Sequence, residues 1–293
     1  MKTYKLTAIL LLAMLVAGCN GTFDNIFFLK ANPMENDDAK ASVSSDSYIS
    51  WIAGEQINLN GTGCIIEEKT PGSFTVECPG TLTAPVCAIY PNTVDTYGNQ
   101  VEVNYSPGAS TLTLKMLSVD YTDNTHATHK VFFPMAAYQS KLSSQLMFDH
   151  LTAGMRFTIE NPTDEACALA AVRIYLYGDE VPTPTEKNGV TVSWENQGPI
   201  IPGGTIGSTT GDVEAEYASE MRFAMMTGGE PNVIIEGHSS ITFCVPVTVR
   251  SLTSFAVTGY KPDWSELFSF QKDISRSLEL NKMYNMPTIT LSR

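Results

Sequence analysis

Positive charge, and charge altogether, are scarce in this sequence. Lysine and arginine number 18 against 31 aspartates and glutamates, so the net charge at pH 7 is −13, and only 17% of the 293 residues are charged. No run of basic residues occurs anywhere in the chain. A protein of this charge repels the phosphate backbone, which excludes nucleic-acid binding.

No apolar run reaches the length of about 20 residues that a membrane-spanning helix needs. The longest, Leu6–Ala17, has twelve residues and follows Lys2 and Lys5, a pattern typical of a secretory signal peptide. It ends in Leu15-Val16-Ala17-Gly18-Cys19, which resembles a bacterial lipobox. We therefore expect export, acylation of Cys19 and an outer-membrane tether, since two acyl chains anchor stably. The alternative is an ordinary signal peptide that happens to end in cysteine.

Cysteine is sparse and lacks paired spacing. Of the six cysteines, five remain after Cys19, and no Cys-x-x-Cys pair occurs among them, which removes the usual zinc and thioredoxin-like spacings. Because five is odd, at least one stays free or pairs outside the chain. Cys64 and Cys78 flank an expected hairpin and could bridge, although a role as small buried hydrophobes is favoured.

Alternation of apolar and polar residues is the main pattern of the mature chain. It predicts strands that turn one face toward a core. The clearest example runs from 241 to 249, where Pro246 indicates an edge strand or a bulge because proline cannot donate to a ladder. Shorter examples lie at 74–78, 101–105, 112–116, 155–159 and 172–176. The predicted fold class is all-β.

Helical periodicity is confined to two stretches, 212–226 and 262–274, so we expect few short helices that serve packing. The remaining pattern predicts two β-sandwich domains in tandem, which divide in the polar stretch 138–144. The expected organisation is a signal peptide at 1–19, a tether with a candidate removable strand at 20–47, an N-terminal sandwich at 48–140 and a C-terminal sandwich at 141–293.

One apolar patch interrupts the polar tether. Ile26, Phe27, Phe28 and Leu29 follow one another just beyond Cys19. Tethers are ordinarily polar and solvated, so four consecutive apolar side chains need a surface that covers them. We expect a strand-like patch with a partner surface.

Patterns for catalysis and for metal or phosphate binding are weak. His126 and His129 lie in a polar loop without the His-Glu-x-x-His arrangement. Gly237–Ile241 lacks the second glycine of a nucleophile elbow, and Gly203–Thr209 lacks the lysine of a phosphate-binding loop. We expect no enzyme, no cofactor and no metal.

Several landmarks occur in order along nearly the whole chain. Besides the lipobox they are Trp51–Ile57, Ala88–Pro91, Phe133–Ala136, Leu146–Ala153, Leu278–Tyr284 and Thr288–Leu291. Each is weak alone, but their order and spacing resemble the fimbrillin family, the lipoprotein subunits of pili in Bacteroidia-type bacteria.

The resemblance implies two transthyretin-like β-sandwiches that are delivered to the cell surface. In stalk subunits of this family a trypsin-like protease removes the N-terminal segment, and the opened groove accepts a C-terminal strand of a neighbouring subunit by β-augmentation. Anchor subunits keep their lipid, and tip subunits cap the fibre. Expected partners are other fimbrial subunits, the outer membrane through the lipid, and host or bacterial surface ligands.

Within that scheme we assign Ile26–Leu29 to the removable strand and Lys30 or Lys40 to the cut. No arginine precedes Arg156, so an arginine-specific protease could not process the chain. Either the subunit is not matured as a stalk subunit, or a lysine-cutting enzyme makes the cut.

For the donor strand we take the segment from Met283 to Leu291, with Ile289 and Leu291 as the side chains that fill pockets. The alternative is that the final hairpin only closes its own sandwich.

A different class of function also fits an exported β protein. Exposed aromatic residues of a surface lipoprotein bind glycans by stacking, and the three tryptophans are the candidates. Trp51, Trp194 and Trp264 each lie in a strand-like or packed context, however, which favours the core or an interface. A hydrolase is the third possibility, and it would need a carboxylate pair that the sequence does not display.

Overall fold

The chain folds entirely into strands and turns in the part that the computed structural model describes. The described residues are 26–36, 51, 53–96, 99–120, 130–131, 133–178, 180, 184–201, 205–206, 217–227, 230–231 and 233–291. The all-β prediction is confirmed. No helix long and apolar enough to cross a membrane occurs among these residues.

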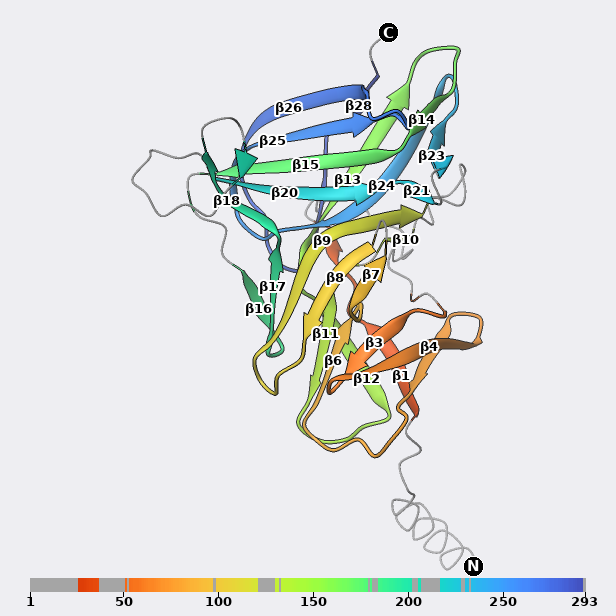
Figure 1. Ribbon diagram of the computed structural model, residues 1–293, viewed down its shortest axis with the longest axis vertical. Helices are drawn as coiled ribbons and strands as arrows, with labels where there is room; N and C mark the ends of the chain where they lie inside the picture. The colour runs from red at the N-terminus through yellow and green to blue at the C-terminus, as the bar shows by residue number, and fades with distance from the viewer. Residues whose placement is uncertain are drawn as a thin grey trace, which may run out of the picture.

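A closed barrel forms the lower half of the molecule (Figure 1). Its strand order is β1-β12-β11-β6-β3-β4-β5. The bounds are β1 Ile26–Ala31, β3 Gln56–Leu59, β4 Thr62–Thr70, β5 Ser73–Glu77, β6 Val86–Tyr90, β11 Met135–Gln139 and β12 Gln145–His150.

A 12-stranded sheet lies above the barrel and follows the path β16-β17-β9-β20-β15-β25-β26 (Figure 1). Strands β8 and β10 pair with β9, β7 pairs with β8, β18 pairs with β20, and β19 pairs with β18. The bounds are β7 Val94–Thr96, β8 Asn99–Asn104, β9 Ser110–Asp120, β10 Lys130–Val131, β15 Ala171–Gly178, β16 Thr185–Lys187, β17 Val190–Trp194, β18 Asn196–Ile201, β19 Thr205–Ile206, β20 Tyr217–Ala224, β25 Ser251–Tyr260 and β26 Glu266–Ser277.

A five-stranded sheet has the order β2-β27-β13-β24, with β28 also on β13, and two small ribbons complete the fold. Its bounds are β2 Glu35–Asn36, β13 Ala153–Asn161, β24 Ser239–Val247, β27 Lys282–Asn285 and β28 Ile289–Thr290. The ribbons pair β14 Cys167–Leu169 with β23 Val233–Ile235, and β21 Met226–Thr227 with β22 Glu230–Pro231.

Two hydrophobic cores correspond to these two halves. The smaller fills the barrel. The larger contains residues of the 12-stranded and five-stranded sheets and extends to Cys87, Ile89 and Ala136 on barrel strands β6 and β11. The two halves do not meet at residue 140 of the sequence. Strand β12, which follows it, belongs to the barrel, and β9, which precedes it, pairs in parallel with β17 and β20 of the upper sheet. The chain therefore crosses between the halves several times, and the tandem transthyretin-like arrangement remains a proposal.

The expected helices are absent from the described part of both stretches. Residues 217–224 form strand β20, and residues 266–274 belong to strand β26. The error has a simple cause, because a spacing of four residues is also two strand periods. Met221 and Phe223 are both buried on one face of β20, as a strand requires. Residues 212–216 lie outside the described residues.

The prediction of a final hairpin, in which residues 278–284 pair with residues 288–291, is also wrong. Strands β27 and β28 do not pair with each other, and both run parallel to β13, with Met283 opposite Gly154 and Ile289 opposite Ile159. Pro287 lies between them, so this part of the connection has no N–H to close a hairpin ladder. The chain continues along β13 instead of turning back.

Candidate functional site

Strand β1 occupies the gap between β5 and β12 and thereby closes the barrel (Figure 1). It runs antiparallel to β5, with Phe27 opposite Val76, and parallel to β12, with Leu29 opposite Leu146. Strands β5 and β12 do not pair directly in the described structure. Without β1 the barrel would therefore have two open edges.

The side chains of β1 alternate between the core and solvent. Phe27 and Leu29 are only 1% and 6% exposed and belong to the barrel core, whereas Phe28 is 48% exposed and Lys30 also faces outward. The expected partner surface for the apolar patch is thus the interior of the barrel, which takes two of the four side chains.

The end of β1 is fastened to β12 by an asparagine. The Asn32 N–H donates to the Phe148 carbonyl over 2.8 Å, and Asn32 Nδ2 donates to Asp149 Oδ1 over 2.7 Å. Asn188 Nδ2 donates to Asp149 Oδ2 over 3.1 Å, and Lys187 Nζ lies 3.5 Å from Oδ1. Burial acts to raise the pKa of Asp149, but these hydrogen bonds and the lysine outweigh it, so the pKa is lowered.

A buried histidine lies beside this fastening. The His150 ring packs edge-on against Phe133 with centroids 6.1 Å apart. Burial lowers its pKa to about 4, although the Asn32 backbone and the Asp149 carboxylate partly oppose the shift. His150 is therefore neutral at pH 7.

The segment that follows β1 reaches the other half of the molecule. Strand β2 pairs in parallel with β27, with Glu35 opposite Lys282, and the Glu35 N–H donates to the Asn281 carbonyl over 2.8 Å. Gly154 leaves room here: a methyl group at its Cα would lie 3.2 Å from Met34 Sδ and 2.6 Å from Met283 Cε. Residues 26–36 therefore span both halves and cover the outer edge of β27.

The candidate donor residues are packed in their own chain. Met283, Ile289 and Leu291 are all buried in the larger core, and the Leu291 N–H donates to the Glu160 carbonyl over 2.9 Å. Tyr284 is buried as well, and its hydroxyl donates to the Ser277 carbonyl. In this state the C-terminal segment closes its own sheet.

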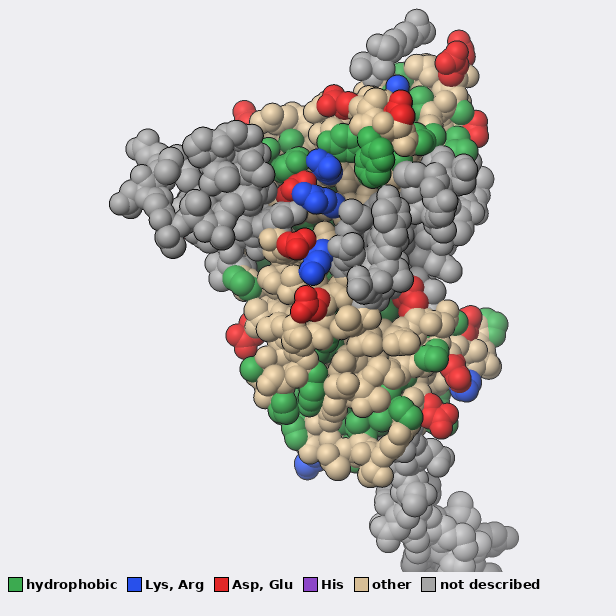
Figure 2. Space-filling view, viewed as in Figure 1, with side chains coloured by type: hydrophobic (Ala, Val, Ile, Leu, Met, Phe, Trp, Pro, Cys, Tyr) green, Lys and Arg blue, Asp and Glu red, His purple; other side chains and the backbone are tan. Residues whose placement is uncertain are grey.

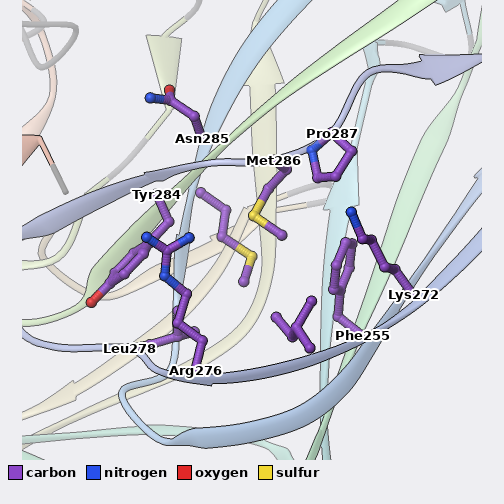
Figure 3. Close-up of a pocket in the computed structure, with 10 residues that line it drawn as sticks. Phe255, Lys272, Arg276, Leu278, Tyr284, Asn285, Met286 and Pro287 are labelled. Carbon is purple, nitrogen blue, oxygen red and sulfur yellow. The ribbon is translucent and has the colours of Figure 1, made fainter. Parts of the chain in front are cut away.

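A cavity of about 380 Å³ lies between this segment and strand β26 (Figure 3). Met155, Phe255, Ile274, Leu278 and Met286 make it largely apolar. Lys272 and Arg276 of β26 lie at its margin, and the Arg276 guanidinium stacks 4.8 Å from the centre of the Tyr284 ring. The connection between β27 and β28 is thus incompletely packed on this side.

The two proposed cleavage lysines differ in what can be said of them. Lys30 has an exposed side chain, but its backbone lies within β1, opposite Met147 of β12. A protease must draw the strand out of the sheet before it can cut there. Lys40 and the acylation candidate Cys19 lie outside the described residues.

The weaker motifs have structural roles or lie outside the description. His238 occupies a turn with φ of 55° and contacts Asp164 Oδ1 at 2.6 Å, while Ser239 Oγ donates to the Glu236 carbonyl. A Ser–His relay is therefore not formed there. His126, His129 and the loop glycines Gly203 and Gly204 are not described. No group of three His, Cys, Asp or Glu residues that could hold a metal occurs among the residues that are.

The landmark residues from three separate motifs meet in the barrel core. The Trp51 ring packs edge-on against Tyr90 at 5.1 Å and Phe148 at 4.8 Å, and Tyr90 Oη donates to Glu55 Oε2 over 2.6 Å. Trp194 is buried too, whereas Trp264 is 52% exposed at the tip of the turn between β25 and β26. The sequence around each tryptophan predicts a strand-like or packed context, so it did not distinguish the exposed Trp264 from the two buried ones.

Basic and acidic side chains lie next to one another on the face shown in Figure 2. The contact that the site depends on most is the hydrogen bond between Asn32 and Asp149, which are 117 positions apart in the sequence. No local signal could have found it.

No known family profile matches the chain, and no curated protein matches it. Among solved structures it is similar to a candidate cell adhesion protein of Bacteroides fragilis, with 13% identity and a TM-score of 0.43 over 90% of this chain and 92% of that one. A candidate cell adhesion protein of Bacteroides ovatus gives 13% identity and a TM-score of 0.36 over 89% and 91%. A fimbrial protein of Bacteroides ovatus gives 11% and 0.32 over 92% of this chain and 51% of that one. Similarities of this size do not assign a function.

Proposed function

We propose that this protein is a structural subunit of a cell-surface fimbria, exported as a lipoprotein through Cys19 and assembled by strand addition. The observation that carries the proposal is the position of β1, which alone closes the barrel between β5 and β12 among the described strands. The sequence resemblance to fimbrillins supplies the context, and the pairing of residues 26–36 with strands of both halves supports it.

Removal of β1 would create a specific acceptor. The edges of β5 and β12 would lose their hydrogen-bond partners, and the sites of Phe27 and Leu29 would become apolar pockets at a spacing of two residues. Each fully buried side chain of this size contributes about 1.5–3 kcal/mol. An extended segment with apolar residues two apart would therefore regain both the hydrogen bonds and the burial.

The C-terminal segment of a second copy has this pattern. Ile289 and Leu291 are two residues apart and flank Thr290, whose side chain faces solvent. Both side chains are buried in their own chain, so donation requires the segment to leave β13 first. Strand β2 covers the outer edge of β27, and a cavity adjoins the segment. Removal of residues 20–40 takes β2 away, so the segment is then released more easily.

Controlled cleavage tests the proposal. Purified residues 20–293 are treated with a lysine-specific protease, the products are identified by mass spectrometry, and an unboiled SDS gel shows their assembly. We expect a cut after Lys30 or Lys40 followed by an SDS-resistant ladder. The double variant Lys30→Gln, Lys40→Gln should give neither, whereas Lys69→Gln, at an exposed lysine of the β4–β5 hairpin, should behave as wild type. A cut product that stays strictly monomeric contradicts the stalk-type role.

A second deletion tests the donor assignment. Chains that lack residues 288–293 should remain folded and lose the ladder after cleavage. An unfolded deletion product would instead mean that the segment serves only its own sheet.

One observation favours glycan binding as a second candidate function. Trp264 is exposed with φ of 64°, a costly conformation for a bulky residue, and Tyr260 lies beside it with ring centroids 6.5 Å apart. Strained backbone conformations cluster at functional sites, so this exposed aromatic pair is a candidate binding surface. Retardation of the soluble chain on glycan affinity gels would support this role.

A further inference from the structure

Two buried cysteines face each other across the β4–β5 hairpin, whose strand β5 forms one edge of the proposed acceptor groove. The register of β4 and β5 pairs Ile66 with Val76, and the same register carried two residues further places Cys64 opposite Cys78. Their side chains are 2% and 6% exposed, and both are free thiols. The Cys78 thiol lies near enough to help raise the pKa of Cys64, whose Sγ contacts the Thr62 carbonyl at 3.5 Å.

The hydrogen-bond phase of the ladder sets the distance between these two residues. Ile66 uses its N–H and carbonyl toward the β3 side, to Glu55 at 2.7 Å and from Gly54 at 2.8 Å. Cys64, two residues earlier, has the same orientation and lies opposite Ile57 of β3. Toward β5 the pair is therefore of the non-hydrogen-bonded kind, in which Cα atoms approach to about 4.5 Å. Disulfides accept Cα separations of about 4.4–6.8 Å.

We propose that Cys64 and Cys78 are joined by a disulfide in the exported protein. Each thiol gives up its proton, an S–S bond forms, and the two electrons reduce the disulfide of an oxidising dithiol oxidoreductase to two thiols. The other three cysteines have different neighbours: Ser110 bonds to Cys87, Arg156 lies beside Cys244, and Cys167 lies in the β14 ribbon. The selection of partners follows from the register.

The bond forms while the hairpin is still open. Burial raises the pKa of the Cys64 thiol to about 12, and the Cys78 thiol adds to this shift, so almost no Cys64 thiolate exists in the folded barrel. The thiolate is the reactive species in disulfide exchange. Both side chains are also buried, out of reach of an oxidoreductase, so oxidation precedes closure of the barrel and the folded reduced protein resists it.

The cross-link has a consequence that rests on the proposed function. Strand β5 is held by β4 on one side and by β1 on the other, and Glu77, next to Cys78, lies opposite Ile26. When β1 leaves, β5 remains paired with β4 alone. A covalent bond between β4 and this end of β5 then holds that edge of the acceptor groove in place.

Thiol mapping tests the bond itself. The full chain is expressed with its own residues 1–19 in a Gram-negative host, recovered from the envelope and denatured with N-ethylmaleimide in the absence of reductant. Cleavage after Lys69 separates the two cysteines, and cleavage after Leu82 separates Cys78 from Cys87. We expect one linked peptide pair, 2 Da lighter than the sum of its thiol forms, with Cys87, Cys167 and Cys244 alkylated. Alkylation of both Cys64 and Cys78 would overturn the proposal.

Thermal unfolding with and without reductant provides an independent readout. Wild-type protein and Cys87→Ala should both lose thermal stability on reduction, whereas Cys64→Ala should not respond. Equal melting of the wild type in both conditions would overturn the proposal. A linked protein that does not polymerise after cleavage would instead contradict the proposed function and leave the disulfide established.

Discussion

Asn32 Nδ2 donates a hydrogen bond of 2.7 Å to Asp149 Oδ1, and this bond ties the end of the first strand to the strand that it covers. Asp149 also accepts a hydrogen bond from Asn188 and lies beside Lys187. One carboxylate therefore joins the N-terminal segment, the barrel and the β16–β17 turn. Release of β1 must break this contact.

Substitution of Asn32 should therefore ease release. We expect Asn32→Ala to lower the free energy of unfolding by about 1–2 kcal/mol, since hydrogen bonds to charged groups contribute about 1.5–3 kcal/mol and this one is partly exposed. Cleavage at Lys30 should become faster, because that cut requires β1 to leave the sheet. Asn104→Ala, which removes an exposed bond to Glu102, is the matched control. Equal cleavage rates in the two variants would contradict the role given to Asn32.

Neighbouring phenylalanines of β1 should differ sharply. Phe27→Ala removes a buried ring and should cost about 3–5 kcal/mol in chemical denaturation, whereas Phe28→Ala at an exposed position should change stability by no more than about 0.5 kcal/mol. Equal effects would show that β1 is not seated in the barrel as described.

Stability should fall in mild acid because of His150. Its pKa is about 4 when folded and 6.5 as a free group, so between these pH values the unfolded state binds more protons. Above pH 6.5 the buried neutral ring does not reduce the free energy of unfolding. As the pH falls from 6.5 toward 4 that free energy decreases, by at most about 3 kcal/mol. Denaturation midpoints measured from pH 7 to pH 4.5 should show this slope, and His150→Gln should flatten it. A wild-type protein with no slope in this range would contradict the burial of the neutral ring.

The exposed tryptophan gives a prediction for the second function. Trp264→Ala should abolish any retardation on glycan gels and leave cleavage-driven assembly intact, because the β25–β26 turn lies in the upper half, away from the barrel. Retention that survives in this variant would place glycan binding elsewhere.

Period-2 alternation predicted the strands well because burial alternates in the folded chain. In β15, for example, Val172, Ile174 and Leu176 are buried, whereas Arg173 and Tyr175 between them are partly exposed. The same rule explains the wrong helix at 212–226, since a repeat of four residues satisfies both periods. The apolar patch at Ile26–Leu29 was sufficient to predict a strand.

The position of that strand could not be predicted. Its register against β5 and β12, the two-residue strand β2 and the parallel placement of β27 and β28 along β13 all depend on contacts between distant residues. Lys30 shows the limit: its charge and location suggested a cleavage site, but the sequence did not show that its backbone lies within a paired strand.

Competition by a synthetic strand tests the central claim most directly. Cleaved protein is incubated with an excess of a peptide of residues 26–31, or with the same peptide carrying aspartate in place of Phe27 and Leu29, and assembly is followed on unboiled SDS gels. The account predicts that the native peptide refills the gap between β5 and β12 and suppresses the ladder, whereas the altered peptide does not. A ladder that forms equally with both peptides would contradict it.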